Sequence, residues 1–220
     1  MTDNGRDVPA AAPAAEPGEV GVGPHPEPWP DDPRLDPALL AEGDRRNVAD
    51  RYRYWRLEAI VADLDAEAFP VEVAIENWEH DFNIGTVVRN ANAFGARTVH
   101  IVGRRRWNRR GAMVTDRYLH VRHHADFASL AAHAAARRLE LVGIDNLAGS
   151  VPIESVRLPR RSLLVFGQEG PGLSEAARAS VSMVCSITMR GSTRSINAGV
   201  ASGIALHEWA RTHADDPPRA

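Results

Sequence analysis

The sequence has no lysine and a single cysteine, Cys185. One cysteine cannot form an internal disulfide and is too few for a structural zinc cage. The sequence also lacks the run of roughly 18 to 20 apolar residues that a membrane helix needs. Its N-terminus lacks the basic and then apolar pattern of a signal peptide. These absences predict a cytoplasmic protein with neither a membrane nor a metal among its partners.

Arginine supplies all 26 basic residues, against 29 acidic residues. Its planar guanidinium suits phosphate contacts and base stacking, although a bias toward GC-rich codons produces the same composition, and both explanations stay open. Residues 1–44 carry ten acidic residues and two arginines, a net charge of −8, so the rest of the chain carries +5. With 44% hydrophobic residues, the chain can bury one good core.

Nine of the fifteen prolines fall between Pro9 and Pro37, among alanine, glycine and acidic residues. Such a segment buries too little apolar surface to offset its ordering entropy. We therefore expect residues 1–43 to be a disordered acidic tail and residues 214–220 a disordered C-terminus. From Arg45, apolar residues recur at helical spacing through Val48, Tyr52 and Trp55, which predicts a helical extension over residues 44–69.

Beyond Pro70, short β-branched runs alternate with helical patterns, which predicts an α/β domain over residues 70–213 with a mostly parallel sheet flanked by helices. The expected strands are 71–76, 98–103, 139–145, 162–167 and 183–189. The expected helices are 84–95, 126–138, 173–181 and 196–212. Ligands of such sheets bind beyond the carboxyl ends of the strands, so the loops there are the place to look for chemistry.

Three of these loops carry residues that the fold alone does not require. The first loop leads through Asn83, a candidate N-cap, into a helix that carries Arg89 beside its apolar stripe. The second, 166–174, has three glycines around Glu169, and glycine lets the backbone fold closely around a ligand. The third, 187–204, places Ser195 and Asn197 before a helix rich in small residues, where capping explains one of them but not both.

Together the three loops resemble the three motifs of the SpoU (TrmH-like) branch of the SPOUT RNA methyltransferases, over residues 71–211. The first motif is met at Asn83, Gly85, Arg89, Ala91, Phe94 and Gly95. The second is met at Gly167, Glu169 and Gly172, and the third at Ser195, Ile196 and Asn197. The sequence departs from the family at Thr188, where proline is frequent, and at Ala198-Gly199, where Val-Ser is frequent.

This resemblance implies a deep C-terminal trefoil knot, a homodimer, and S-adenosylmethionine bound in the knot. The residues then expected around the cofactor are Gly167, Gly172, Ile187, Met189 and Ile196. The implied reaction moves a methyl group to a ribose 2'-hydroxyl of tRNA or rRNA. Arg89 would act on the hydroxyl, either as its base or as a cation that stabilises the alkoxide. Asn83 would orient Arg89, Glu169 would tie the cofactor loop to the catalytic helix, and Ser195 and Asn197 would hold the third loop and contact the ribose.

A second group of residues suits RNA binding. The loop after the strand 98–103 holds five arginines and one aromatic residue: Arg104, Arg105, Arg106, Trp107, Arg109 and Arg110. Such a loop can neutralise phosphates and stack on a base, or it can simply be solvated. His120, His123 and His124 lack acidic or cysteine companions at ligand spacing, so we expect no metal there.

Two rival functions stay open. The first is a non-catalytic knotted RNA-binding or assembly factor, and the presence of all five proposed catalytic residues argues against it. The second is a nucleotide-binding oxidoreductase, and the missing G-x-G-x-x-G after the first strand argues against that.

Overall fold

The computed structural model describes residues 21–79 and 82–213, and the chain divides into two compact units between Asp63 and Leu64. This division falls inside a helix, α2 (Leu57–Ala66), and six residues before the expected domain start at residue 70. Residues 1–20 and 214–220, for which we expected disorder, lie outside the described residues. Within the described part of the chain, no helix is long and apolar enough to cross a membrane.

The expected disorder is wrong for residues 21–43. A short helix, α1 (Pro37–Glu42), begins after Asp36, whose carboxylate accepts a hydrogen bond from the backbone N of Ala38 at 2.9 Å. Leu35 and Leu40 are buried, although the segment has few aliphatic residues. Leu35 pairs with Trp55 in an antiparallel β-bridge, and Tyr52, Tyr54 and Trp55 later in the same unit are also buried. The composition of residues 1–43 alone could not show these partners.

The continuous helix expected from Arg45 is also absent. The chain instead forms a single 3-10 turn, η1 (Asp50–Tyr52), and takes a positive φ of 62° at Tyr54 before α2 begins. The buried carboxylate of Asp44 explains this path. It accepts hydrogen bonds from the Arg46 guanidinium and from the backbone N of Tyr54 at 3.0 Å. The apolar spacing therefore reflects packing around Asp44 rather than one helical face.

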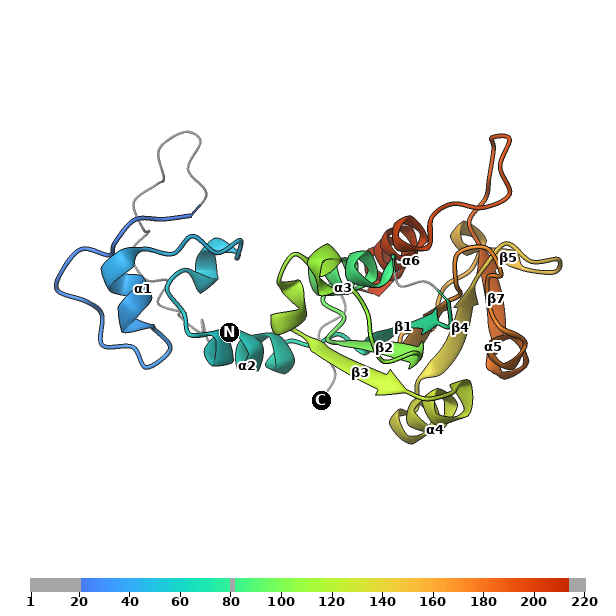
Figure 1. Ribbon diagram of the computed structural model, residues 1–220, viewed down its shortest axis with the longest axis horizontal. Helices are drawn as coiled ribbons and strands as arrows, with labels where there is room; N and C mark the ends of the chain where they lie inside the picture. The colour runs from blue at the N-terminus through green and yellow to red at the C-terminus, as the bar shows by residue number, and fades with distance from the viewer. Residues whose placement is uncertain (1–20, 80–81, 214–220) are drawn as a thin grey trace, which may run out of the picture. The chain divides into compact units, whose positions relative to one another are not determined.

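The described residues of the larger unit form a seven-stranded sheet in which every pairing is parallel, in the order β3-β2-β1-β6-β4-β7-β5 (Figure 1). The strands are β1 (Val71–Asn77), β2 (Thr98–Gly103), β3 (His120–His124), β4 (Glu140–Ile144), β5 (Val151–Pro152), β6 (Ser162–Phe166) and β7 (Met183–Ser186). The expected parallel sheet and its five predicted strands are confirmed. The two unpredicted strands, β3 and β5, are the edges, where a polar or very short strand is common.

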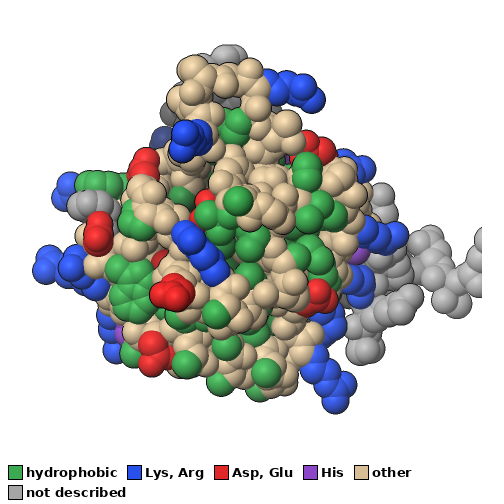
Figure 2. Space-filling model, turned by 90° about the vertical axis from the view of Figure 1, so that its right-hand side faces the viewer, with side chains coloured by type: hydrophobic (Ala, Val, Ile, Leu, Met, Phe, Trp, Pro, Cys, Tyr) green, Lys and Arg blue, Asp and Glu red, His purple; other side chains and the backbone are tan. Residues whose placement is uncertain are grey.

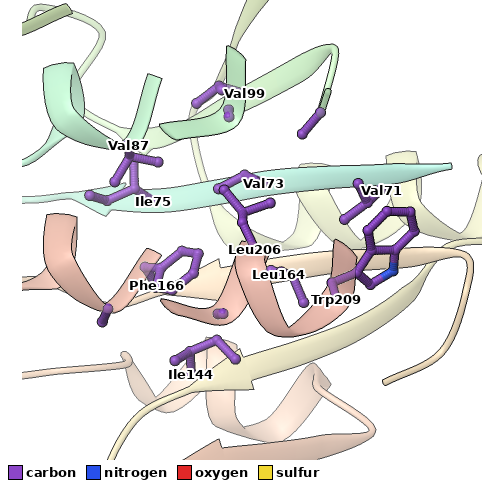
Figure 3. Packing of buried hydrophobic residues seen from close by; sticks show 14 of the residues in the cluster. Val71, Val73, Ile75, Val87, Val99, Ile144, Leu164, Phe166, Leu206 and Trp209 are labelled. Atoms are coloured by element: carbon purple, nitrogen blue, oxygen red, sulfur yellow. The ribbon is translucent and has the colours of Figure 1, made fainter. Parts of the chain in front are cut away.

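Helices cover both faces of this sheet (Figure 1). α3 (Ile84–Ala93) and α6 (Ala198–His213) lie on one face, and α4 (Phe127–Arg137) and α5 (Glu175–Ser180) lie on the other. Figure 3 shows Val73 and Leu164 of the central strands packed with Leu206 and Trp209 of α6. Short 3-10 turns, η2 (Arg109–Ala112), η3 (Thr115–Arg117) and η4 (Ile153–Ser155), occupy the connections.

The last strand, β7, lies between β4 and β5, which follow each other in the chain. The connection between β4 and β5 must therefore cross from one side of β7 to the other. Asn146 in this connection accepts a hydrogen bond from the backbone N of Ile187 at 3.1 Å and donates one to the backbone O of Arg194 at 2.8 Å. The segment that leaves β7 is thus held against this connection at two points. The threading of the C-terminal stretch stays a prediction from the resemblance.

Candidate active site

A chain of side-chain hydrogen bonds joins the three loops that the sequence singled out. The side-chain amide of Asn83 donates to the Glu169 carboxylate at 3.0 Å. The side-chain amide of Asn197 donates to the Oδ1 of Asn83 at 2.7 Å. Because each residue comes from a different loop, this chain fixes the start of α3, the loop after β6 and the start of α6 relative to one another.

Asn197 has a second role at the start of α6. Its Oδ1 accepts hydrogen bonds from the backbone N of Gly199 at 2.9 Å and of Val200 at 3.2 Å. The side chain therefore caps the helix with its oxygen and binds Asn83 with its nitrogen. Asn83 stands at the N-cap position of α3, as expected, but its side chain makes no capping hydrogen bond. Its amide is used for the bridge between loops instead.

A cavity of about 240 Å³ opens at the carboxyl ends of β4, β6 and β7. Its apolar lining comes from Ile144, Phe166, Ile187 and Ile196, and its polar lining includes Asp145, Asn146, Glu169, Ser195 and Asn197. Four of the five residues expected around the cofactor, Gly167, Gly172, Ile187 and Ile196, line this cavity. Met189 does not. It lies two residues beyond Ile187, where the chain has already left the cavity wall.

Two glycines are required by the tight turn beside this cavity. Gln168 and Gly172 exchange backbone hydrogen bonds at 3.1 and 3.0 Å. A Cβ on Gly167 would lie 2.0 Å from the carbonyl carbon of Gly172, which is backbone and cannot yield. Gly172 has a φ of 72°, and a Cβ there would lie 2.4 Å from the Oδ2 of Asp145.

The sequence reasoning missed three polar residues that hold this region together. Asp145 and Asn146 line the cavity, and the Asp145 carboxylate accepts a hydrogen bond from the backbone N of Leu173 at 2.9 Å. The Oε1 of Gln168 accepts from the backbone N of Trp78 at 2.9 Å and of Glu79 at 2.7 Å. The position of Asp145 and Asn146 directly after a strand was the signal that could have identified them.

Arg89 does not line the cavity of its own chain. Its side chain is exposed and makes no hydrogen bond or ion pair with the described residues. The expected orienting contact from Asn83 is therefore absent, since the Asn83 amide binds Glu169 and Asn197 instead. Arg89 lies next to Asn90, which joins α3 to α6 by donating to the backbone O of Gly199 at 2.8 Å.

The arginine loop after β2 is ordered although its guanidinium groups are exposed. The buried side chain of Asn77 donates to the backbone O of Arg104 at 2.7 Å and of Arg106 at 3.1 Å. A surface hollow of about 760 Å³ is lined here by Asn77, Glu79, Arg104, Arg106, Trp107, Asn108 and Arg109. The guanidinium of Arg109 lies 5.9 Å from the centre of the Trp107 ring. Arg105 and Arg110 are exposed beside the hollow rather than in its lining.

A hydrogen bond to Gln168 links the hollow to the cavity. Gln168 lines the cavity, and it accepts a hydrogen bond from the backbone of Glu79, which lines the hollow. Figure 2 shows the β5, β7 and α5 end of the larger unit, where hydrophobic side chains are spread over the middle and basic side chains lie mostly around the edge. The cavity can hold a small molecule that has both apolar and polar parts. The arginines beside it can bind phosphates.

This chain is similar to proteins named as RNA methylases or methyltransferases. The model of the SpoU rRNA Methylase family matches residues 70–207. An uncharacterised tRNA/rRNA methyltransferase of Mycolicibacterium vanbaalenii is 32% identical over 187 residues, which cover 79% of this chain and 58% of that protein. The chain spans about half the length of the curated relatives it matches.

Two solved structures share the fold. The A. aeolicus TrmH/SpoU tRNA modifying enzyme superposes with a TM-score of 0.65 at 21% identity, over 73% of this chain and 83% of that one. The SpoU methyltransferase AviRb from Streptomyces viridochromogenes, solved in complex with AdoMet, superposes with a TM-score of 0.60 at 27% identity, over 65% of this chain and 60% of that one.

Proposed function

This chain belongs to the SpoU rRNA methylase family, and on that premise we propose that it transfers a methyl group from S-adenosylmethionine to a ribose 2'-hydroxyl of tRNA or rRNA. The observation that carries the proposal is the hydrogen-bonded chain of Asn83, Glu169 and Asn197 at the rim of the cavity. It unites the three motif loops around one small-molecule site.

The chemistry of the cavity fits S-adenosylmethionine. Ile144, Ile187 and Ile196 offer apolar surface for the adenine ring, and the backbone around Gly167 and Gly172 offers amides and carbonyls for its polar edge. The carboxylate of Asp145 places negative charge in the lining, which suits a positively charged sulfonium. When bound, S-adenosylmethionine supplies an electrophilic methyl group.

The arginine loop would bind the RNA. The exposed Arg104, Arg105, Arg106, Arg109 and Arg110 can neutralise phosphates, and Trp107 offers an aromatic surface for an unpaired base. Asn77 fixes the loop backbone, so little ordering entropy is lost when RNA binds.

Arg89 would act on the cavity of a second subunit. Val200 and Ile204 are 53% and 38% exposed and lie one turn apart on α6, whose first residues line the cavity. A homodimer formed through α3 and α6 would cover these apolar side chains and carry Arg89 toward the partner's cavity. This pairing accounts for an exposed arginine in a motif whose Asn83 is hydrogen-bonded to two residues of the cavity lining.

The proposed role of Arg89 is that of a cation. A guanidinium with a pKa above about 12 is a poor base near neutral pH. Arg89 would instead bind the phosphate beside the target ribose and stabilise the alkoxide as the hydroxyl proton leaves. Asn83, Glu169, Ser195 and Asn197 would hold the loops and the ribose in the geometry for transfer.

The test is methyl transfer to total RNA, followed by nucleoside analysis by mass spectrometry. We expect 2'-O-methylated nucleosides from the wild-type protein. We expect Arg89→Ala to lose transfer while its affinity for S-adenosylmethionine, measured by calorimetry, stays within a few fold. The matched control is Arg157→Ala, an exposed arginine on the loop before the amino end of β6.

A different experimental result would contradict each part of the proposal. A methylated base in place of a methylated ribose would overturn the choice of oxygen. Full turnover by Arg89→Ala would overturn the role of that residue. Cofactor binding without any methyl transfer by the wild-type protein would support a non-catalytic RNA-binding or assembly factor instead.

A further inference from the structure

A buried polar cluster lies on the face of the sheet that α4 covers. Glu72 on β1, His100 on β2 and His133 on α4 form its centre, and His124 on β3 and Arg137 on α4 flank it. The Nε2 atoms of His100 and His133 lie 2.7 and 2.8 Å from the same oxygen, Oε2 of Glu72. The activity proposed above makes no use of this cluster.

We propose that Glu72, His100 and His133 form a binding site for a divalent transition metal of the zinc type. One donor atom from each of these three residues lies within 4.8 Å of the other two. Two imidazole nitrogens and one carboxylate oxygen are a donor set that zinc takes in proteins, with a fourth position left for water.

The two distances from the Glu72 oxygen to the histidine nitrogens are close to those that such a metal needs, and the two nitrogens lie within 4.8 Å of each other. Tetrahedral bonds of about 2.0 to 2.1 Å place neighbouring donor atoms about 3.3 Å apart, so the hydrogen-bonded atoms need to separate by only about 0.5 Å. His133 can supply this movement, because its side chain is 13% exposed. The same exposure would give a metal ion a route into the site.

The surrounding residues would hold the ligands in place. The Nε of Arg137 lies 2.8 Å from Oε1 of Glu72, which leaves Oε2 as the single donor oxygen. The Nδ1 of His100 lies 2.9 Å from the Nε2 of His124. A metal on the Nε2 of His100 puts the ring proton on Nδ1, where it is donated to His124. Outer contacts of this kind orient ligating histidines in metal sites.

The charges of the cluster agree with this assignment. Burial alone would raise the pKa of Glu72, but hydrogen bonds from His100 and His133 bring it down to about 2, so the carboxylate is ionised. Burial lowers the pKa of His100, and burial together with the charges of the neighbouring histidines lowers the pKa of His124 to about 4. Ionised carboxylate and neutral imidazole are the forms that bind metals.

A network without metal is the competing arrangement, and it differs in one observable way. In that network His100 donates its Nε2 proton to Glu72, so the ring proton is on Nε2. With metal bound, the ring proton is on Nδ1. Nitrogen-15 chemical shifts of the histidine rings distinguish these two tautomers.

The experiment uses the full-length protein, dialysed against a chelator and titrated with Zn²⁺ in a calorimeter. We expect one equivalent of Zn²⁺ per chain, a rise in melting temperature on its addition, and a shift of the His100 proton to Nδ1. Co²⁺ in place of Zn²⁺ should give the visible absorption of a four-coordinate site. Glu72→Gln and His133→Gln should each weaken Zn²⁺ binding at least tenfold.

His123→Gln is the matched control, since His123 is on the same strand as His124 but contacts the backbone O of Gly103 outside the cluster. It should bind Zn²⁺ as the wild-type protein does. Two results would overturn the proposal: a wild-type protein that takes up no Zn²⁺ and keeps the His100 proton on Nε2, or unchanged uptake by both Glu72→Gln and His133→Gln. The second result would place the ion on other histidines of the nine in the chain.

Discussion

The substitution Asn83→Asp tests whether the hydrogen-bonded chain of Asn83, Glu169 and Asn197 organises the cofactor site. The change keeps the size of the side chain and its Oδ1, which still accepts from Asn197. It replaces the amide that donates to Glu169 with an oxygen that carries negative charge. Two carboxylates then face each other across a contact that is 3.0 Å long in the native protein.

The expected loss follows from this distance. Two unit charges about 3 Å apart repel by about 1.4 kcal/mol in a water-like dielectric and by about 5.5 kcal/mol at an effective dielectric constant of 20. Glu169 is exposed, so the lower end applies. Loss of a hydrogen bond to a charged acceptor adds about 1.5 to 3 kcal/mol. A total of roughly 3 to 4.4 kcal/mol, if expressed in cofactor binding, weakens it about 150-fold to 1,700-fold.

Calorimetric titration with S-adenosylmethionine measures this loss. Glu169→Gln added to Asn83→Asp should recover most of the affinity, because the new amide at position 169 can donate to the new carboxylate at position 83. A double-mutant cycle of the four proteins isolates the pairwise energy. If Asn83→Asp binds the cofactor as tightly as the wild-type protein, or if the second change brings no recovery, the bridge does not organise the site.

Three further outcomes follow from the structure. Gly85→Ala places a Cβ 2.5 Å from the backbone of Gly111 and should lower the melting temperature by about 4 to 8 °C, whereas Gly191→Ala, with nothing within 4 Å, should leave it unchanged. Replacing Arg104, Arg105 and Arg106 with glutamine should reduce, by about 2, the slope of the logarithm of the RNA-binding constant against the logarithm of the salt concentration. An unchanged slope would exclude this loop from phosphate contacts. Burial would raise the pKa of Asp44, but hydrogen bonds from Arg46 and the backbone of Tyr54 hold it below its ordinary 3.8. The folded state of the smaller unit should therefore lose stability as pH falls below about 3.8. The variant Asp44→Asn should lack the stability contributed by this carboxylate even at neutral pH. An NMR signal of the Trp55 indole that does not change during acid titration would contradict this.

The regular part of the larger unit was predictable because its sequence patterns are local. The strand over residues 98–103 was predicted with the bounds of β2, and the four helices were found within a few residues of their observed ends. β3 was missed because HVRHH has no apolar alternation, and its stability comes from pairing with β2 at the edge. Glu72 and Glu76 in β1 (VEVAIEN) are buried, which charged residues placed between apolar ones in a strand do not reveal.

Part of the candidate site was predictable for a different reason. Gly167, Glu169 and Asn197 follow strands at the carboxyl edge of a parallel sheet, and such residues must gather there. Their partners were not predictable. Asn83 was expected to orient Arg89, but its amide binds a carboxylate 86 residues away and accepts from an amide 114 residues away.

The sequence by itself determined the parallel sheet, the loops that carry its polar residues and the excess of arginine beside them. The sheet and its loops follow from the sequence because the spacing of hydrophobic residues and the choice of turn residues act over only a few positions. The tertiary structure alone decided that Asp44 organises the smaller unit, that Arg89 does not line its own cavity, and that Glu72, His100 and His133 meet under α4. Each of these depends on which strands and helices pack together. Burial and long-range hydrogen bonds settle that choice, and neither is written in the spacing of neighbouring residues.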